Sequence, residues 1–222
     1  MKIHTYDTKK YDFKGILEEF FGIELEKLPE KIKFPKLVLP DSHDIWVKTY
    51  NFMESREFSE AWNRFSDDIM KKILDEESIV LQKLPSIKIF PSKRSIEFTP
   101  MKSPIHTDGQ KPYYHPKFET NFWLPLTDVD EFNTMSIYNY DKRCLEPQLL
   151  KYGELLEFKG NTIPHGSKKY SKSNNTRVSF DFRGCKFSDY DESILKPIEI
   201  YSPNKSRLQN EWFTIGTYYG LR

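Results

Sequence analysis

The sequence predicts a mainly β fold of the jelly-roll type with a layer of helices on one outer face. From about residue 86 onward, short runs alternate apolar and polar residues with period two, and clusters of Pro, Gly and Asn separate them. The aromatic share of 15% suits a β-rich interior. Because no helical segment lies between these runs, the strands are expected to be antiparallel and to form a sandwich or barrel.

Residues 1–85 are expected to be mostly helical and to pack on that core. Apolar residues recur at helical spacing from Phe13 to Phe21, and Gly22 is placed to end this helix. A second helix is predicted over roughly residues 55–76, with Ser55 as its N-cap. Its apolar stripe consists of Phe58, Ala61, Trp62, Phe65, Ile69 and Ile73. Three prolines between the two helices predict an extended connector around Leu37–Leu39.

Residues 86–185 are expected to form the jelly-roll core and residues 186–222 a C-terminal tail, all within a single domain of 222 residues. The predicted strands are Ile87–Phe90, Ser95–Thr99, Thr120–Leu126, Thr134–Asn139, Glu154–Phe158 and Thr176–Phe182.

Composition narrows the class of partner. A formal net charge of +1 gives no overall field that would attract nucleic acid or an anionic membrane. The chain has no run of about 18 apolar residues, which excludes a transmembrane helix. The two cysteines, Cys144 and Cys185, indicate reduced thiols in the cytoplasm. We therefore expect a cytoplasmic protein with a small-molecule partner, and the sequence leaves its oligomeric state open.

Two histidines and a carboxylate stand out as metal ligands. His106 and Asp108 are two residues apart, so in a strand both side chains point the same way, and His165 supplies a third donor from another strand. This is the facial triad of non-haem Fe(II) oxygenases, which leaves three coordination positions open. A bidentate 2-oxo acid fits two of them and O2 the third.

The alternative is that these histidines are structural, because an isolated His-x-Asp occurs by chance in many chains. This chain has five histidines, however, and two of them occupy the required places in a β-context. His4 and His43 lie in the helical part and are interpreted as structural.

An arginine twelve residues after His165 indicates a site for an acidic co-substrate. Arg177 and Ser179 share one face of their strand, so a guanidinium fork and a hydroxyl could both bind the distal carboxylate of 2-oxoglutarate. The alternative is an internal ion pair of Arg177 with Asp181 or Glu119. The opposite, apolar face consists of Val178, Phe180 and Phe182.

Together these segments resemble the Fe(II)/2-oxoglutarate-dependent oxygenases, and most closely their streptomycin-biosynthesis-type (StrG-like) subgroup. The resemblance covers roughly residues 85–185 and rests on four blocks: His106-Thr-Asp108, residues 119–127 (ETNFWLPLT), residues 160–166 (GNTIPHG) and residues 176–183 (TRVSFDFR). It implies a double-stranded β-helix, Fe(II) on His106, Asp108 and His165, and 2-oxoglutarate on Arg177 and Ser179. The presence of Asp108 argues against the halogenase variant, which lacks that carboxylate.

Four further residues are candidates for contacts beside the metal. Asn121 is expected to contact the co-substrate or substrate, or else to link strands. Trp123 is expected to wall the site or to fill the core. Tyr114 and His115, in the loop after Asp108, are candidate substrate contacts, with a solvated loop as the alternative. Lys168, Lys169 and Lys172 could attract an anionic substrate or form only a solvated hairpin tip.

The leading hypothesis is an Fe(II)- and 2-oxoglutarate-dependent dioxygenase that uses O2 to hydroxylate or otherwise oxidise a small biosynthetic molecule, such as an amino acid or a carbohydrate-linked metabolite. Decarboxylation of 2-oxoglutarate to succinate would accompany the reaction. Two rivals stay open: a protein or peptide hydroxylase, and a cupin-like metal-binding module without turnover.

Overall fold

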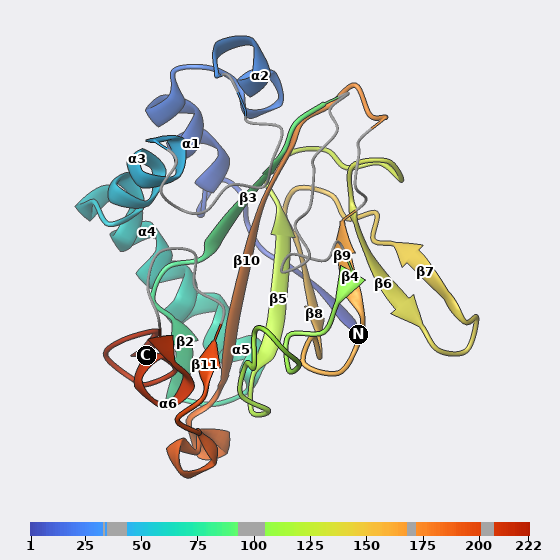
Figure 1. Cartoon of the computed structure of the whole chain (residues 1–222). Helices are drawn as coiled ribbons and strands as arrows, with labels where there is room; N and C mark the ends of the chain where they lie inside the picture. Colours follow the sequence, from blue (N-terminus) through green and yellow to red (C-terminus); the bar gives the residue numbers. More distant parts are fainter. Residues whose placement is uncertain (33, 35–43, 93–104, 168–171, 201–206) are drawn as a thin grey trace.

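The fold consists of two β-sheets with a helical layer over the outer face of the larger one (Figure 1). The computed structural model describes residues 1–32, 34, 44–92, 105–167, 172–200 and 207–222. The predicted strand Ser95–Thr99, the Leu37–Leu39 connector, Lys168 and Lys169 lie outside these residues. No helix in the described ranges is long and apolar enough to cross a membrane.

The large sheet has seven strands in the order β1-β8-β5-β10-β2-β13, and β3 also pairs with β10. Its strands are β1 (Lys2–Thr5), β2 (Ile79–Gln82), β3 (Ser86–Phe90), β5 (Thr120–Pro125), β8 (Glu154–Phe158), β10 (Arg177–Lys186) and β13 (Tyr219–Leu221). The strands of this sheet pair in antiparallel fashion. Strand β10 lies at its centre, with β5 along one edge and β3 and β2 along the other.

The small sheet has four strands in the order β4-β9-β6-β7. They are β4 (Ile105–His106), β6 (Met135–Asn139), β7 (Cys144–Pro147) and β9 (His165–Ser167). From β5 onward the chain passes from the large sheet to β6 and β7 in the small one, back to β8, out again to β9, and returns in β10. A separate pair, β11 (Glu199–Ile200) and β12 (Arg207–Leu208), belongs to the C-terminal part.

The helices cover the face of the large sheet that points away from the small sheet (Figure 1). They are α1 (Phe13–Phe21), α2 (Leu28–Lys31), α3 (Asp44–Met53), α4 (Arg56–Phe65) and α5 (Lys71–Leu74). The short helix α6 (Gln209–Trp212) belongs to the C-terminal part, whose Trp212 and Phe213 pack with Val80 and Cys185 of the large sheet. Gly22 ends α1 in the left-handed conformation, at a φ of 63°, which glycine adopts without steric cost. The Ser55 side chain caps α4 by accepting a hydrogen bond from the Phe58 amide.

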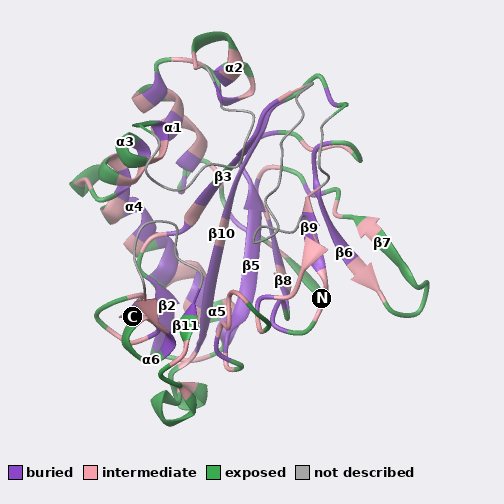
Figure 2. Cartoon of the chain, in the orientation of Figure 1, coloured by how far each residue is buried: buried purple, intermediate pink, exposed green. Residues whose placement is uncertain are grey.

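The main core forms where β10 packs against the helices. Apolar and polar side chains alternate along β10, so one of its faces is apolar. Val178, Phe180 and Phe182 point to the helical side and are fully buried. The Phe180 ring packs edge-on against Phe58 at 5.8 Å between ring centroids. Trp62 packs on Phe182 at 4.9 Å. The buried strands and the inner sides of the helices are visible in Figure 2.

A second core lies between the two sheets. It is built from Trp123, Met135, Ile137, Leu150, Leu156 and Phe158. Because Trp123 is 2% exposed and belongs to this cluster, its side chain joins the sheets. The two cores leave the odd-numbered positions of β10 facing the interior between the sheets.

The sequence-based expectations of both helices, their caps, and five of the six strands are confirmed by elements at the same places. Strand β10 is longer than expected and continues to Lys186. The first 85 residues also contribute β1 and β2 to the large sheet, and the tail contributes β13. β1 and β2 have four residues each and β13 has three, so none carries an alternating pattern long enough to detect, and β2 is also buried throughout.

We expect Phe180→Ala to lower the free energy of unfolding by about 3–5 kcal/mol, since it removes a buried ring between β10 and two helices. Denaturant unfolding monitored by circular dichroism measures this change. Phe187→Ala is the matched control, because Phe187 is 47% exposed, and we expect a change within about 0.5 kcal/mol. Equal effects of the two substitutions would contradict this account of the core.

Candidate metal centre

The two histidines come together through strand pairing in the small sheet. His106 on β4 and His165 on β9 are direct cross-strand partners, and their ring centroids are 4.8 Å apart. Strand β4 ends at His106, so Asp108 lies in the following turn and not, as expected, in the same strand. The turn forms because the Asp108 amide leaves the ladder and donates to the carbonyl of Gly160 at 2.8 Å.

The side chains of His106, Asp108 and His165 offer three ligand atoms within 4.8 Å of one another. Oδ1 of Asp108 lies 3.4 Å from Nε2 of His106 and 3.8 Å from Nε2 of His165. Asp108 and His165 are buried, whereas the His106 side chain is 26% exposed. Two imidazole nitrogens and one carboxylate oxygen thus face a common point that solvent reaches from the His106 side.

The second oxygen of Asp108 is held by three donors. Oδ2 accepts from Nδ2 of Asn121 at 2.6 Å and from Nε and Nη2 of Arg183 at 3.1 and 2.8 Å. Asn121 and Arg183 are themselves cross-strand partners on β5 and β10. Burial alone would raise the pKa of the Asp108 carboxyl, but the Arg183 charge, the hydrogen bond from His106 and the nearby histidines His115 and His165 together outweigh it and hold that pKa well below its usual range. Asp108 is therefore ionised, with Oδ1 directed at the histidines.

His165 is held in the tautomer that a metal requires. Its Nδ1 lies 2.9 Å from the carbonyl oxygen of Ile163, which can only accept, so Nδ1 carries the proton and Nε2 the lone pair. Burial lowers the pKa of His165, although the neighbouring Asp108 charge opposes the shift. The imidazole is consequently neutral at pH 7.

Two glycines permit this close packing around Asp108. A Cβ on Gly160 would lie 2.6 Å from the Asn121 amide, and one on Gly109 would lie 2.7 Å from the carbonyl oxygen of Asn161. Both distances are shorter than real Cβ contacts, so only glycine at these two positions lets the loops approach the site this closely.

Arg177 and Ser179 lie on the same face of β10 as Arg183, as their spacing predicts. Nη1 of Arg177 donates to the carbonyl of Asn133 at 2.9 Å, and the guanidinium lies over the Phe90 ring at 5.3 Å. Among the described residues, Nε of Arg177 and Oγ of Ser179 are buried without a hydrogen-bond partner. Burial lowers the pKa of Arg177 to about 10, which still leaves it charged at pH 7.

The remaining candidate residues fall into different surroundings. His115 turns away from the ligand atoms: its Nδ1 lies 2.8 Å from Oε2 of Glu119, and its ring packs on Phe213 at 4.7 Å. Tyr114 packs against the C-terminal part, and its carbonyl accepts from Gln209 at 2.6 Å. Glu119 binds His115 and the Tyr219 hydroxyl, so the anticipated pairing of Glu119 with an arginine is absent among the described residues.

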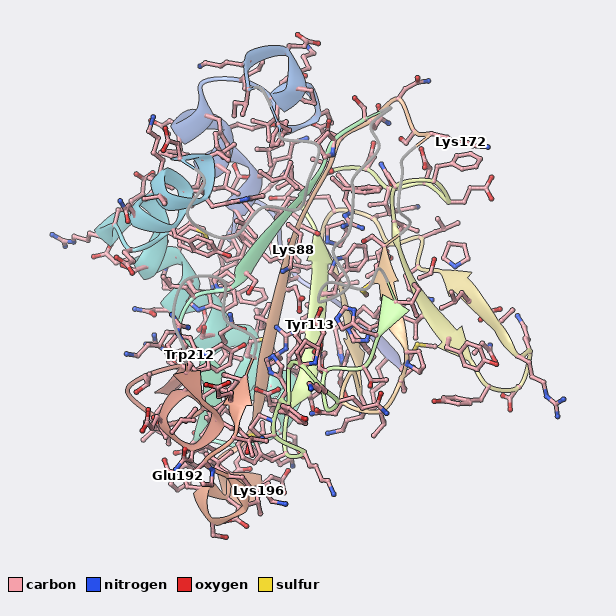
Figure 3. All side chains as sticks on the ribbon, viewed as in Figure 1. Lys88, Tyr113, Lys172, Glu192, Lys196 and Trp212 are labelled. Carbon is pink, nitrogen blue, oxygen red and sulfur yellow. The ribbon has the colours of Figure 1, made fainter. Side chains whose placement is uncertain are left out.

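Sequence reasoning missed two contributors to the site. The sequence did not indicate that Arg183 binds Asp108, because the two are 75 residues apart. Tyr113, in the loop after the first two ligands, packs its ring 4.8 Å from that of His106, in front of β5 and next to β4 (Figure 3). Only the alternation along β10 could have hinted at Arg183.

Comparison with known proteins found similarities at low sequence identity. No protein-family model matches the chain. It is 28% identical over 149 residues to the streptomycin biosynthesis protein StrG of Streptomyces griseus, which covers 66% of this chain and 67% of StrG. Similar solved structures include AviO1 from Streptomyces viridochromogenes Tue57, with a TM-score of 0.46 and 9% identity over 84% of this chain and 89% of AviO1.

Two further similar structures are described as enzymes. One is SnoK, a non-heme alpha-ketoglutarate-dependent carbocyclase from nogalamycin biosynthesis, with a TM-score of 0.46 and 13% identity over 82% of this chain and 76% of SnoK. The other is a Pseudomonas putida prolyl-4-hydroxylase, with a TM-score of 0.41 and 11% identity over 83% of this chain and 87% of that one. The chemistry of the site follows from its own side chains.

We expect Arg183→Gln to weaken Fe(II) binding about 10- to 100-fold, because Asp108 loses the donors that direct Oδ1 at the histidines. Loss of orientation outweighs the greater basicity of the freed carboxylate. Anaerobic Fe(II) titration measures the dissociation constant, with circular dichroism to verify folding. The control is Arg143→Gln on the exposed hairpin after β6. A folded Arg183→Gln protein with wild-type affinity would refute this role.

The affinity of the site for a metal ion is also expected to decrease as the pH is lowered. Because the pKa of His165 is lowered by burial, protons begin to displace metal from its Nε2 only below the ordinary histidine pKa of about 6.5. Below the His165 pKa, the apparent affinity should drop about tenfold per pH unit for this ligand, while Asp108 stays ionised. Co(II) titrations between pH 5 and 8 measure this limb, and a pH-independent affinity would contradict imidazole ligation.

Proposed function

We propose that this chain is an Fe(II)- and 2-oxoglutarate-dependent oxygenase that oxidises a small biosynthetic molecule, and that its two sheets form a double-stranded β-helix. The observation that carries the proposal is the convergence of His106, Asp108 and His165, whose ligand atoms lie within 4.8 Å of one another, with the Nε2 lone pair of His165 left free by the hydrogen bond at its Nδ1. StrG, to which the chain is similar, is a biosynthesis protein, which supports a small-molecule substrate.

The donor set fits Fe(II). Two imidazoles and one carboxylate on one side form the facial triad of non-haem iron oxygenases, and the open positions lie opposite. Because Oδ2 of Asp108 is occupied by Asn121 and Arg183, only Oδ1 is available to the metal. The carboxylate would therefore bind through one oxygen and leave room for other ligands.

The site also fits 2-oxoglutarate. Buried polar atoms are almost always paired, yet Nε of Arg177 and Oγ of Ser179 have no partner among the described residues. A carboxylate placed between them would accept from both and would neutralise a buried guanidinium. Both ends of the Asn121 amide are already engaged, by Asp108 and by the Gly160 amide, so we assign Asn121 to orienting Asp108.

When bound, iron and 2-oxoglutarate supply O2 activation coupled to decarboxylation of the 2-oxo acid to succinate. The protein's own contribution is positional. His106, Asp108 and His165 would hold the metal, and Arg177 and Ser179 would hold the distal carboxylate. The layer of Trp123 and its neighbours excludes water from one side of the interior between the sheets.

The test is an anaerobic titration of the metal-free protein with Fe(II) and 2-oxoglutarate, monitored by the visible metal-to-ligand charge-transfer band. The band should appear with both additions and be absent from Asp108→Ala. Succinate formation in air then tests turnover. Iron binding without a band would favour the cupin-like metal-binding module. A band with turnover stimulated only by peptides would favour the peptide hydroxylase.

We further expect Arg177→Ala to weaken 2-oxoglutarate binding by about 2–5 kcal/mol, the range for truncating one partner of a buried charged pair. The dissociation constant is read from the charge-transfer band. Arg177→Lys should restore part of the affinity, because an ammonium keeps the charge but not the planar fork. Arg56→Ala, which removes an exposed arginine of α4, is the control. An unchanged constant in Arg177→Ala would remove this residue from the site.

A further inference from the structure

A carboxylate that the metal and co-substrate sites leave unused lies between them. Asp181 occupies the face of β10 that carries Arg177, Ser179 and Arg183, which we call the site face. Its side chain is 20% exposed, whereas Ser179 is fully buried and Arg183 is 7% exposed. Solvent therefore reaches the site face at Asp181.

The neighbours of Asp181 place it beside the metal ligands. Across the sheet it pairs with Trp123 on β5 and with Ser86 on β3, so the three side chains form one row on the site face. Its charge acts on His165, Arg177 and Arg183. A substrate bound beside His165 on the site face would therefore lie near Asp181.

Asp181 keeps acceptor capacity for a ligand. Nη1 of Arg183 lies 3.5 Å from Oδ1 of Asp181. This distance is longer than the 2.8 Å and 3.1 Å contacts from the same guanidinium to Asp108. Arg183 is thus primarily bound to Asp108. Among the residues that the structure describes, no hydrogen-bond donor reaches the Asp181 carboxylate at normal hydrogen-bonding distance.

A chain of hydrogen bonds ends beside Asp181 and leaves a donor there. The Tyr218 hydroxyl donates to Oε1 of Gln82 at 2.9 Å, and Nε2 of Gln82 donates to Oγ of Ser86 at 3.2 Å. Because Oγ of Ser86 is the acceptor in this chain, its own proton is available for another acceptor. The row therefore presents an acceptor at Asp181 next to a donor at Ser86.

We propose that Asp181 determines substrate specificity by accepting a hydrogen bond from a hydroxyl or ammonium group of the substrate, with Ser86 donating to the same hydroxyl or its neighbour. The substrate class is thus a polyhydroxylated or aminated small molecule. This inference rests on the proposed oxygenase function, because it places the substrate on the open side of the metal. Lys88 lies two residues after Ser86 on β3 and is exposed (Figure 3). The competing outcome of the test is that the site selects an anion, which Lys88 would attract.

Four six-carbon compounds on one linear scaffold serve as probes: glucamine, sorbitol, gluconate and hexanoate. Their binding to the full-length protein, loaded with Zn(II) and 2-oxoglutarate so that no turnover occurs, is measured by saturation-transfer NMR. We expect glucamine and sorbitol to bind, gluconate to bind more weakly and hexanoate not to bind. Asp181→Asn should weaken glucamine binding about 10- to 100-fold, the range for a hydrogen bond to a charged group. Asp181→Glu should retain part of it.

The control is Asp141→Asn, which neutralises an exposed carboxylate on the hairpin after β6. The proposal is overturned if gluconate binds as well as glucamine, if Asp181→Asn leaves glucamine binding unchanged, or if none of the hydroxylated probes binds. The Fe(II)–2-oxoglutarate band of the same proteins is recorded separately. If that band forms while the probe ranking fails, the oxygenase function stands and the role of Asp181 falls; if the band is absent, the oxygenase function itself fails.

Discussion

The buried ion pair between Asp108 and Arg183 joins the candidate metal centre to the middle of the large sheet. Both groups lie in the interior, so each would pay a large desolvation penalty without the other. Two guanidinium nitrogens and the Asn121 amide converge on one carboxylate oxygen. The turn that carries Asp108 is therefore fixed in position, and the other oxygen is left for a metal. Removing one partner would leave an uncompensated buried charge in the site.

Strand β10 links this pair to the rest of the molecule because its two faces serve different purposes. The even-numbered positions from Val178 to Phe182 anchor the strand in the aromatic core beneath α1 and α4. The odd-numbered positions from Arg177 to Arg183 face the interior between the sheets. Because the same backbone carries both sets of side chains, packing of the apolar face against the helices also fixes the positions of the site residues. The geometry of the site therefore depends on packing on the opposite face of the strand.

The C-terminal part braces the other side of the site. The buried Glu119 carboxylate binds His115 and the Tyr219 hydroxyl, and Gln209 binds the carbonyl of Tyr114. The loop after Asp108 is thus held between β5 and residues about 100 positions later in the sequence. The sequence showed no motif in this tail, because such contacts need only one buried polar partner and an aromatic neighbour.

Periodicity along the chain was sufficient to predict most elements and the face on which each side chain lies. The alternation in β10, the stripe of α4 and the caps Ser55 and Gly22 depend on neighbouring residues only, so they could be predicted without a structure. The spacing of His106, Asp108, His165 and Arg177 was sufficient to predict a metal centre, and the structure brings the first three residues together. Tertiary structure alone decided that His106 pairs with His165, that Arg183 and Asn121 share Asp108, and that Asp181 lies next to Ser86. These contacts depend on strand register, which non-local hydrogen bonds and core packing set together, and no local pattern encodes it.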